Sequence, residues 1–474
     1  MFSRLACVIC LLAFGAFSSA QSEIDSLVSR IDSLKDADYD RLKAIGDSAF
    51  VRILPIASER LKTENARPTE KNAASAAYAL QALVACATPR RTRAVTALYD
   101  KTSRETLQWI LFQWMASEGD PSVNRQLFED KLYLASRNAN GQSGLAVTGL
   151  VRIGDAAAVK LLIGYMKNKK TPEDFRNGIF VRLARTGSPQ ALDAVRRAVP
   201  RDRKLPPLSQ RVDLSAKDDV VATHRDKSGV EWGLVRSSGF GCPNDLWLVR
   251  KRRGRWGDAV FTGVSEYWPM YQTGRRLEGF EAHDAELKNL VELKGWIKRF
   301  VGNPDLTKDR DGDGYSDVVE KWLGLDPGKT DSDGDGLPDG IDKNPLAARR
   351  PLDDIESALL AAFEAETAER RMEGTLFVAY PAGVKPFEVT SWSGLVLPDE
   401  GRAKPTRPEA LFGFRFRLGF SSGPPVKFGK DGKTAEVQIQ ESGGYYEKID
   451  VVTLRKFGNE WFPVDVRNAG WAIS

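Results

Sequence analysis

The hydrophobic pattern divides the chain into a helical first part and a strand-rich second part. Over residues 22–200 apolar side chains recur at three- and four-residue steps, which predicts helices. Four similar helix ends begin at Leu83, Trp114, Leu150 and Leu183, which are 31, 36 and 33 residues apart. Each ends at a Gly or Thr, and a Ser, Asp or Pro then opens the next helix. This period predicts stacked helical pairs that share one core.

The second part is predicted to be mainly strands, because the hydrophobic period changes to two after a linker at 201–207. We expect a β-rich domain at 206–282, a helix at 283–302 and an α+β domain at 351–474, which opens with a helix over Pro351–Met372. The expected strands are Val220–Thr223, Val230–Ser237, Leu246–Arg252, Ala259–Val264, Thr375–Tyr380, Phe387–Leu397, Leu411–Phe420, Thr434–Gln440, Ile449–Phe457 and Trp461–Asn468.

The two strand-rich regions are similar in sequence. When residues 231–256 are aligned with 436–461, seven of 26 positions are identical and apolar positions coincide between them. The similarity predicts a duplicated β-meander. Its C-terminal copy, one long helix followed by antiparallel strands, resembles a cystatin-like α+β fold.

Composition is that of an ordinary globular protein, with 42% hydrophobic and 28% charged residues. The net charge of +5 is too balanced to indicate nucleic-acid binding. Residues 305–345, however, hold twelve acidic against five basic side chains. Beyond residue 20 only Cys86 and Cys242 remain, too few for a disulfide framework. Cys86 is expected to be a buried helical thiol, and a bridge to Cys242 stays open.

The first twenty residues have the order of a secretory signal peptide. Arg4 gives the positive charge, Leu5–Phe17 the apolar segment, and residues 18–20 the small side chains before a cleavage site. The mature chain is expected to start near Gln21, outside the cytoplasm. The alternative is an uncleaved anchor, although the apolar run is shorter than the roughly 20 residues that span a bilayer.

A complete calcium-loop pattern lies in the acidic segment, at Asp309–Glu320. Calcium takes about six to eight oxygen ligands, which a twelve-residue loop supplies from positions 1, 3, 5, 7, 9 and 12. Gly314, at position 6, permits the sharp turn. The expected ligands are Asp309, Asp311, Asp313, the Tyr315 carbonyl, Asp317 and Glu320.

A second loop, Asp331–Asp342, begins 22 residues after the first. Asp342 closes it and is one methylene shorter than Glu, so its bidentate reach is smaller. The crowded carboxylates repel one another without a cation, and calcium is therefore expected to order the segment. The alternative is an acidic, flexible linker. The expected ligands are Asp331, Asp333, Asp335, the Leu337 carbonyl, Asp339 and Asp342, with Asn303, Asp305 and Asp326 as supplementary candidates.

Residues 303–346 resemble bacterial thrombospondin type-3 repeats, including the Leu325–Pro327 spacer and the Asp342–Pro345 ending. The resemblance implies two or more structural calcium ions in a rigid connector of a secreted or surface protein. Paired EF-hands are not expected, because Pro304 denies the first loop an entering helix. The helices over roughly 70–200 resemble HEAT or armadillo-type repeats.

Catalytic motifs are not found in the sequence. Beyond the signal segment the chain has two histidines, His224 and His283, and neither belongs to a recognisable triad or zinc motif. Phosphate-binding loops and nucleophile elbows are also missing. Trp232, Trp247 and Trp256 are a candidate sugar-binding face, but core packing is the simpler expectation.

These patterns predict a multidomain α and α+β protein: α-solenoid-like repeats at 21–200, a β-meander domain, a calcium-loop connector at 303–346 and a C-terminal α+β domain. We expect a secreted, periplasmic or cell-surface structural protein, not an enzyme, in which calcium stiffens a connector between interaction domains. Its expected partners are calcium and a protein or cell-envelope component, with no nucleic acid and no transmembrane segment after signal cleavage. The alternative is an exported enzyme, or enzyme accessory, acting on glycans or peptides.

Overall fold

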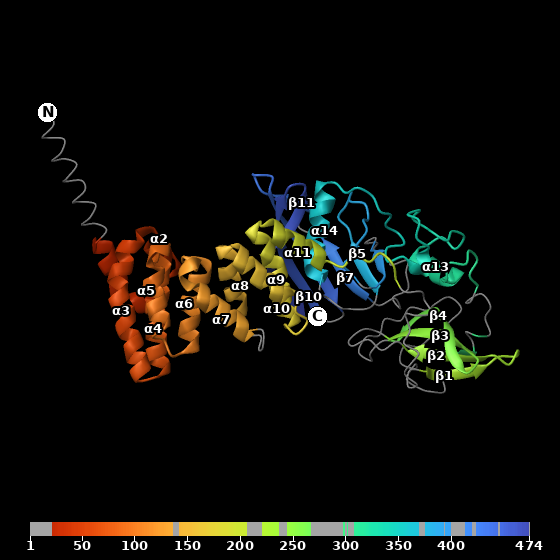
Figure 1. Ribbon diagram of the computed structural model, residues 1–474, viewed down its shortest axis with the longest axis horizontal. Coiled ribbons are helices and arrows are strands. Elements are labelled where there is room, and N and C mark those ends of the chain that lie inside the picture. Colours follow the sequence, from red (N-terminus) through yellow and green to blue (C-terminus); the bar gives the residue numbers. More distant parts are fainter. Residues whose placement is uncertain are drawn as a thin grey trace, which may run out of the picture. The chain divides into compact units, whose positions relative to one another are not determined.

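The computed structural model has helices in the first part of the chain and two β-sheets in the second (Figure 1). The chain divides into two compact units, residues 1–192 and 193–474. The predicted signal peptide at 1–20 lies outside the described residues, as does most of the predicted helix at 283–302. The structure describes residues 21–135, 142–205, 220–236, 244–266, 297–298, 301, 308–368, 375–392, 394–399, 413–419, 423–443 and 446–473.

Helices of the first part contact one another in a repeating order. They are η1 (Ile31–Ser33), α2 (Asp36–Ile45), α3 (Asp47–Ala66), α4 (Glu70–Cys86), η2 (Pro89–Arg91), α5 (Thr92–Tyr99), α6 (Glu105–Ser117), η3 (Pro121–Asn124), α7 (Arg125–Ala135), α8 (Gln142–Ile153), α9 (Ala156–Lys167), α10 (Glu173–Leu183), η4 (Ala184–Thr186) and α11 (Pro189–Ala198). Successive pairs form between α3 and α4, α5 and α6, α7 and α8, and α9 and α10. The second members also follow one another, with α4 against α6, α6 against α8 and α8 against α10.

The four similar helix ends of the sequence occupy the same place in successive pairs. These four segments form the C-terminal ends of helices α4, α6, α8 and α10. Gly154 and Gly187 follow two of these ends with φ of 63°, a conformation that glycine adopts without strain. Side chains of Asp120, Asp155 and Ser188 accept backbone N–H groups at the start of the next helical segment. The predicted stop and start signals are therefore confirmed.

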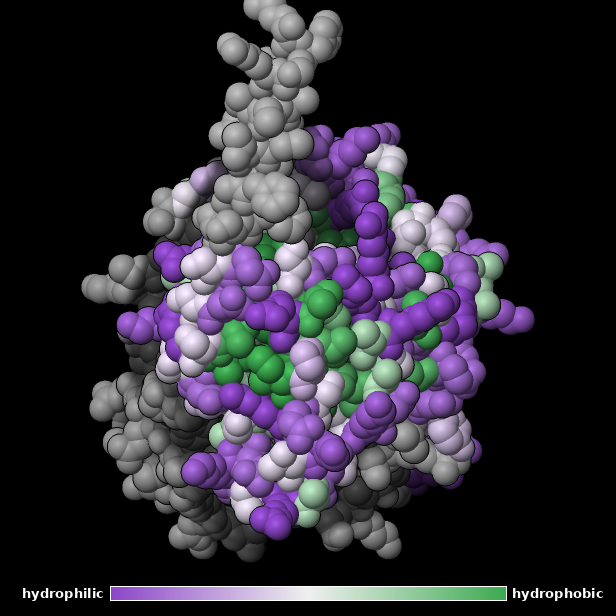
Figure 2. All heavy atoms as spheres, turned by 90° about the vertical axis from the view of Figure 1, so that its left-hand side faces the viewer, coloured by the Kyte–Doolittle hydropathy of each residue, from purple (hydrophilic) through white to green (hydrophobic). Residues whose placement is uncertain are grey.

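Hydrophobic side chains fill the interior of the first unit and also reach its surface. Cys86 is a free, buried thiol on α4, and burial raises its pKa to about 12; Cys242 lies outside the described residues. Figure 2 shows apolar side chains gathered on the end of the unit where α2 and α3 lie. Val51 of α3 is among the exposed apolar residues. Within the described ranges, every helix is too short or too polar to cross a bilayer.

The second unit contains a four-stranded antiparallel meander. It consists of β1 (Val220–Arg225), β2 (Glu231–Arg236), β3 (Asn244–Arg252) and β4 (Arg255–Glu266), in that order. β3 and β4 are joined by a two-residue turn in which Arg253 and Gly254 have φ of 49° and 79°. Positive φ at both positions matches the twist of a hairpin. The four expected strands are present, and β4 extends further at both ends.

The C-terminal sheet has the strand order β11-β10-β9-β7-β5-β6, with β8 paired to β9. Its strands are β5 (Thr375–Ala379), β6 (Val396–Pro398), β7 (Gly413–Leu418), β8 (Lys427–Phe428), β9 (Thr434–Gly443), β10 (Tyr446–Phe457) and β11 (Glu460–Ile473). Helix α14 (Asp354–Thr367) packs against β9, β10 and β11. Its buried Leu359 and Phe363 share one core with Phe416 and Val437 of the sheet.

This domain differs from the expectation in its sheet and in its helix. The sheet is mixed and not purely antiparallel, because β5 runs parallel to both β6 and β7. Helix α14 begins three residues after the expected Pro351, since Asp353 and Glu356 form a capping box at its start. The expected end at Met372 lies outside the described residues.

One expected strand, Phe387–Leu397, is mostly absent. Strand β6 occupies only the end of this range. Phe387 and Trp392 are buried as a strand would have them. However, the backbone of Val389 hydrogen-bonds in both directions with the side-chain amide of Asn344, at 2.9 and 3.1 Å, and not with a neighbouring strand. Burial without a strand partner produced the wrong prediction.

A second apolar cluster joins the two sheets through a short helix, α13 (Asp317–Leu323). Its buried members are Val235 and Val249 of the meander, Tyr315, Val319, Leu323 and Leu325 in and around α13, and Phe377 and Leu397 of the C-terminal sheet. Because α13 includes the end of the first acidic loop, that loop belongs to a folded core and is not a free linker.

The β3–β4 and β10–β11 hairpins have the same register at their turns. Lys251 lies opposite Trp256, and Lys456 lies opposite Trp461. In both pairs the ammonium lies over the indole ring, with Nζ 5.0 and 5.3 Å from the ring centroid. The preceding hairpins, β2–β3 and β9–β10, pair in different registers. The predicted duplication therefore has a geometric counterpart in one hairpin of each sheet.

Candidate metal centre

The two acidic loops share one backbone fold, in which their own N–H groups bind their own carboxylates. Asp309 accepts hydrogen bonds from the N–H groups of Gly312 and Gly314, at 2.7 and 3.1 Å. Asp313 accepts one from the N–H of Tyr315 at 2.7 Å. The equivalent residues of the second loop, each 22 positions later, make the same bonds. The spacing in the sequence therefore corresponds to a repeated structure.

Glycine is required at two positions of each loop. Gly312 and Gly334 have φ of 80° and 81°, and Gly314 and Gly336 have φ of 104° and 93°. These values lie where a side chain is strained, so the loops depend on the freedom of glycine. The turn predicted at Gly314 is confirmed.

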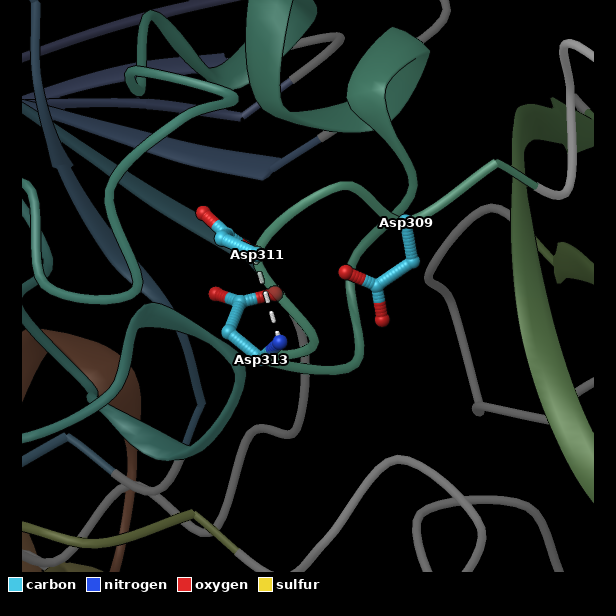
Figure 3. A group of neighbouring side chains, drawn as sticks. All are labelled: Asp309, Asp311 and Asp313. Atoms are coloured by element: carbon cyan, nitrogen blue, oxygen red, sulfur yellow. Dashed lines mark hydrogen bonds between the residues drawn. The ribbon is translucent and has the colours of Figure 1, made fainter.

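Carboxylates come together in three clusters within the described part of the chain. Asp309, Asp311 and Asp313 form the first, and Figure 3 shows them along one turn, with the hydrogen bond from the Asp313 N–H to Asp311. The equivalent three aspartates form the second cluster. The third combines both loops, because it contains Asp313, Glu320 and Asp339. In every cluster one oxygen from each residue lies within 4.8 Å of the others.

Glu320 is the least compensated of these groups. It is fully buried, and neither carboxylate oxygen has a hydrogen-bond partner. One oxygen of Asp311 and one of Asp333 are also buried and unpartnered. Buried polar atoms are almost always hydrogen-bonded, so these oxygens need an explanation. An all-oxygen donor set with uncompensated buried oxygens fits a hard divalent cation.

Burial and mutual repulsion raise the pKa of these carboxyl groups. Burial, followed by the charges of neighbouring aspartates, raises the pKa of Glu320 to about 8. Burial also raises the pKa of Asp313 and Asp339 in the shared cluster to about 6. In the second loop it raises the pKa of Asp333 and Asp342 to about 6. A bound cation would reverse these shifts by favouring the charged forms.

The predicted ligands at position nine are Asp317 and Asp339. Each accepts hydrogen bonds from the second residue of its own loop. Asp317 accepts from the Arg310 N–H at 3.0 Å and pairs with the Arg310 guanidinium at 3.2 Å. Asp339 accepts from the N–H and the hydroxyl of Ser332, at 2.9 and 2.6 Å. Of the two, only Asp339 belongs to a cluster found among the described residues. Position nine of a calcium loop often acts through a water molecule.

The two loops close differently. Glu320 lies on α13, whereas Asp342 follows a single 3-10 turn, η8 (Asp339–Ile341). Asp342 is buried and accepts from the Asn344 N–H at 2.8 Å, and it lies outside the three clusters. Residues 342–353 contain no helix. The second loop therefore lacks an exiting helix.

A positive side chain that sequence reasoning missed lies at the second loop. Arg203, in the predicted linker, forms ion pairs with Asp335 and Glu388. Residues 203–205 also pair in antiparallel fashion with 341–343, through backbone hydrogen bonds and one isolated bridge. These contacts join positions far apart in the chain, and no local pattern signals them.

Tryptophans considered for glycan binding are engaged in other contacts. The Trp232 indole N–H donates to Asp226 at 2.9 Å, and Arg250 lies over its ring, 5.8 Å from the centroid. The Trp256 ring lies beneath Lys251 and packs against the cluster around α13. Packing and cation–π contact account for both rings.

Some other candidates lie away from the clusters or outside the description. His224 is on β1, opposite Trp232. Asp326 pairs with Lys329, its Oδ2 3.3 Å from Nζ. Outside the described residues lie His283, Asn303, Asp305 and the side chain of Trp247.

Chemically, this centre offers oxygen ligands to a cation. Its carboxylates are fixed by backbone N–H groups, and the fully buried Glu320 is raised in pKa and has no hydrogen-bond partner. Such an arrangement concentrates oxygen ligands in the three clusters. Comparisons of the chain with protein-family models, with curated proteins and with solved structures find no match, so the conclusion about this centre depends on its geometry.

Proposed function

We propose that the protein binds calcium through its two acidic loops and that calcium stabilises the connector they form. The observation that carries the proposal is the fully buried carboxylate of Glu320, whose oxygens have no hydrogen-bond partner although Asp313 and Asp339 lie beside it. A bidentate Glu at position 12 is the residue that closes a calcium loop. Calcium would supply the positive charge that this carboxylate lacks.

Each loop offers enough oxygen ligands for one ion. The proposed first set is Asp309, Asp311, Asp313, the Tyr315 carbonyl and Glu320, and the proposed second set is Asp331, Asp333, Asp335, the Leu337 carbonyl and Asp342. Neither set contains a His or Cys, which zinc and copper favour. A flexible, carboxylate-rich loop also suits calcium better than magnesium, which demands near-ideal octahedral geometry.

The proposed role of calcium is structural. Helix α13 carries Glu320 on one side, and it carries Val319 and Leu323 into the apolar cluster between the two sheets. An ion held by Glu320 would fix the position of α13 and, through it, this cluster. The resemblance of residues 303–346 to thrombospondin type-3 repeats supports the same role.

We further propose that the first unit is a HEAT- or armadillo-like repeat module of an exported protein and binds a protein or cell-envelope partner. The repeated pairing of its helices supports a solenoid. Tyr78 on α4 and Trp109 on α6 are 42% and 43% exposed, although both are large aromatic residues. Aromatic residues are enriched in protein interfaces.

Calorimetric titration with calcium tests the proposal. The parent protein should bind two ions, with affinities near the roughly 10⁻⁴–10⁻³ M of extracellular modules or tighter. Asp311→Ala and Asp333→Ala should each abolish one of the two sites. Terbium, sensitised by Tyr315, gives an independent count. A parent protein that takes up no calcium, or two variants that titrate like it, would refute the proposal.

A further inference from the structure

We propose that Asp339 of the second loop completes the calcium site of the first loop, so that the two loops bind calcium as one coupled unit. This inference rests on the proposed calcium function and adds a ligand from outside the first twelve-residue loop. Position nine of the first loop itself, Asp317, is paired with Arg310 and contributes to none of the clusters. The structure thus brings Asp339 to the site in its place.

The shared cluster has the properties of a ligand set. Asp313, Glu320 and Asp339 each offer an oxygen within 4.8 Å of the other two. Glu320 and Asp339 are fully buried, and both oxygens of Glu320 are unpartnered. No ion pair among the described residues involves any of the three, because the nearby Arg310 and Lys308 pair with Asp317. Among the described residues the cluster therefore has no paired cationic side chain, and a bound metal cation would supply the positive charge.

Direct packing between the loops holds Asp339 in this position. The Gly340 N–H, next in the chain, donates to Asp313 Oδ2 at 3.0 Å. A Cβ on Gly340 would lie 2.0 Å from the Asp313 carbonyl oxygen, so only glycine permits this approach. The Thr330 hydroxyl adds a contact to the Asp311 carbonyl at 3.4 Å. The two loops form one packed body at this point.

Coupling between the sites follows from this arrangement. Asp339 is held by Ser332 of the second loop, whose fold depends on the carboxylates at Asp331 and Asp333. An ion that orders the second loop therefore also positions Asp339 for the first. By linkage, an ion in the first site must increase the affinity of the second by the same factor.

The test uses calcium titration in a background with one site. Asp333→Ala removes the second site, so the remaining titration reports the first loop, whose affinity should already be lower than in the parent because Asp339 is held less firmly. In this background Asp339→Asn, which keeps the size of the side chain and removes its charge, should weaken calcium binding by roughly 10- to 100-fold. Gly340→Ala, which separates the loops without changing a ligand, should weaken it similarly.

Three control variants separate the ligand role from general damage. Gly328 lies between the two loops in the sequence, and a Cβ there would meet its nearest neighbour, Asp326 Oδ1, at an ordinary 3.6 Å. Asp431→Asn removes a charge from an exposed surface turn. The Gly328→Ala and Asp431→Asn variants should both bind calcium as the background does. Ser332→Ala removes one hydrogen bond of Asp339 and keeps its charge, so it should weaken binding less than Asp339→Asn.

The outcomes are distinguishable. If Asp339→Asn retains the affinity of the Asp333→Ala background, the shared site is refuted while calcium binding by the first loop stands. If Gly340→Ala does not fold, as circular dichroism would report, the isosteric Asp339→Asn decides. If the parent protein binds no calcium at all, the proposed function itself fails and the shared site fails with it.

Discussion

At the scale of single residues, Glu320 determines the chemistry of the connector. A carboxyl group with a pKa of about 8 instead of the ordinary 4.5 resists ionisation inside the protein. Holding it charged without a cation costs roughly 5 kcal/mol relative to the unfolded chain, because its pKa rises from 4.5 to about 8 and one pKa unit corresponds to about 1.36 kcal/mol. That cost is a large share of a typical folding free energy. Glu320 therefore lowers the free energy of unfolding of the metal-free protein, and a bound cation would remove this cost.

Metal-free stability should depend on pH in a direction opposite to that of most acidic groups. Because the folded protein holds the Glu320 proton more tightly than the unfolded chain, the free energy of unfolding should fall as pH rises from about 4.5 to about 8. Calcium, which binds the charged form, should bind more tightly over the same range. Melting temperatures at pH 5, 6.5 and 8, with chelator and with calcium, measure both trends. A metal-free melting temperature that is constant or rises over this interval would contradict the assignment.

Glu320→Gln should separate stability from binding. The amide keeps the shape of the side chain and removes the charge, so the metal-free variant should be more stable than the parent at pH 8. Its calcium affinity at the first site should fall by at least the roughly 10- to 100-fold that loss of an outer-shell partner costs, because Glu320 is proposed as a direct ligand. Chemical denaturation and calorimetry measure the two effects. Glu447→Gln, at an exposed position on β10, is the matched control and should change neither.

At the scale of secondary-structure elements, α13 links metal binding to the core. It is a seven-residue helix, which is too short to be stable alone. Ser316 caps its start, and Gly324, with φ of 80°, ends it. The rest of its stability comes from Val319 and Leu323, which are buried between the two sheets. A change in this core should therefore alter the calcium affinity of the metal centre.

Leu323→Ala tests that link. The side chain is 1% exposed, and its truncation should reduce the free energy of unfolding by about 2–5 kcal/mol. Because α13 then holds Glu320 less firmly, calcium affinity should fall although no ligand has changed. Denaturant unfolding and calorimetry measure both. Lys321→Ala, on the exposed side of the same helix, should leave them unchanged. Unaltered calcium affinity in the Leu323 variant would show that the core and the metal centre are independent.

Elements were predictable from sequence where a local signal determines them. Helix ends such as those at Gly154 and Gly187 follow from backbone chemistry, and the loop pattern follows from its glycines. The range Phe387–Leu397 failed, because its burial pattern is that of a strand while its partner, Asn344, is a side chain. The parallel pairing of β5 also could not be predicted, because it depends on contacts between distant segments.

At the scale of the whole molecule, distant segments of the second unit meet at the second loop. Arg203 contacts Asp335 and Glu388, and the Val396 N–H at the start of β6 donates to the Lys343 carbonyl at 2.7 Å. The spacing of the loops predicts candidate ligands. It does not predict that distant segments meet at the second loop, or that Asp339 lies beside Asp313 and Glu320. Both arise from tertiary packing, which a single sequence does not reveal.

Arg203→Ala should weaken the contacts between these segments. Removing the guanidinium leaves the nearly buried Asp335 without its positive partner, which should reduce the free energy of unfolding by roughly 1–3 kcal/mol. Saturating calcium should restore more stability to this variant than to the parent, because the ion also neutralises Asp335. Thermal unfolding with chelator and with calcium measures the difference. Arg349→Ala, which removes a mostly exposed arginine 4.0 Å from Glu388, is the control. Equal calcium stabilisation of all three proteins would contradict this role for Arg203.

A crystal structure of the protein grown with calcium, with anomalous diffraction to locate the ions, tests calcium binding by the connector most directly. We expect an ion bound by both oxygens of Glu320, with Asp313 and Asp339 among its ligands, and a second ion among Asp331, Asp333 and Asp335. A structure in which Glu320 is buried without an ion, at saturating calcium and neutral pH, would contradict this expectation.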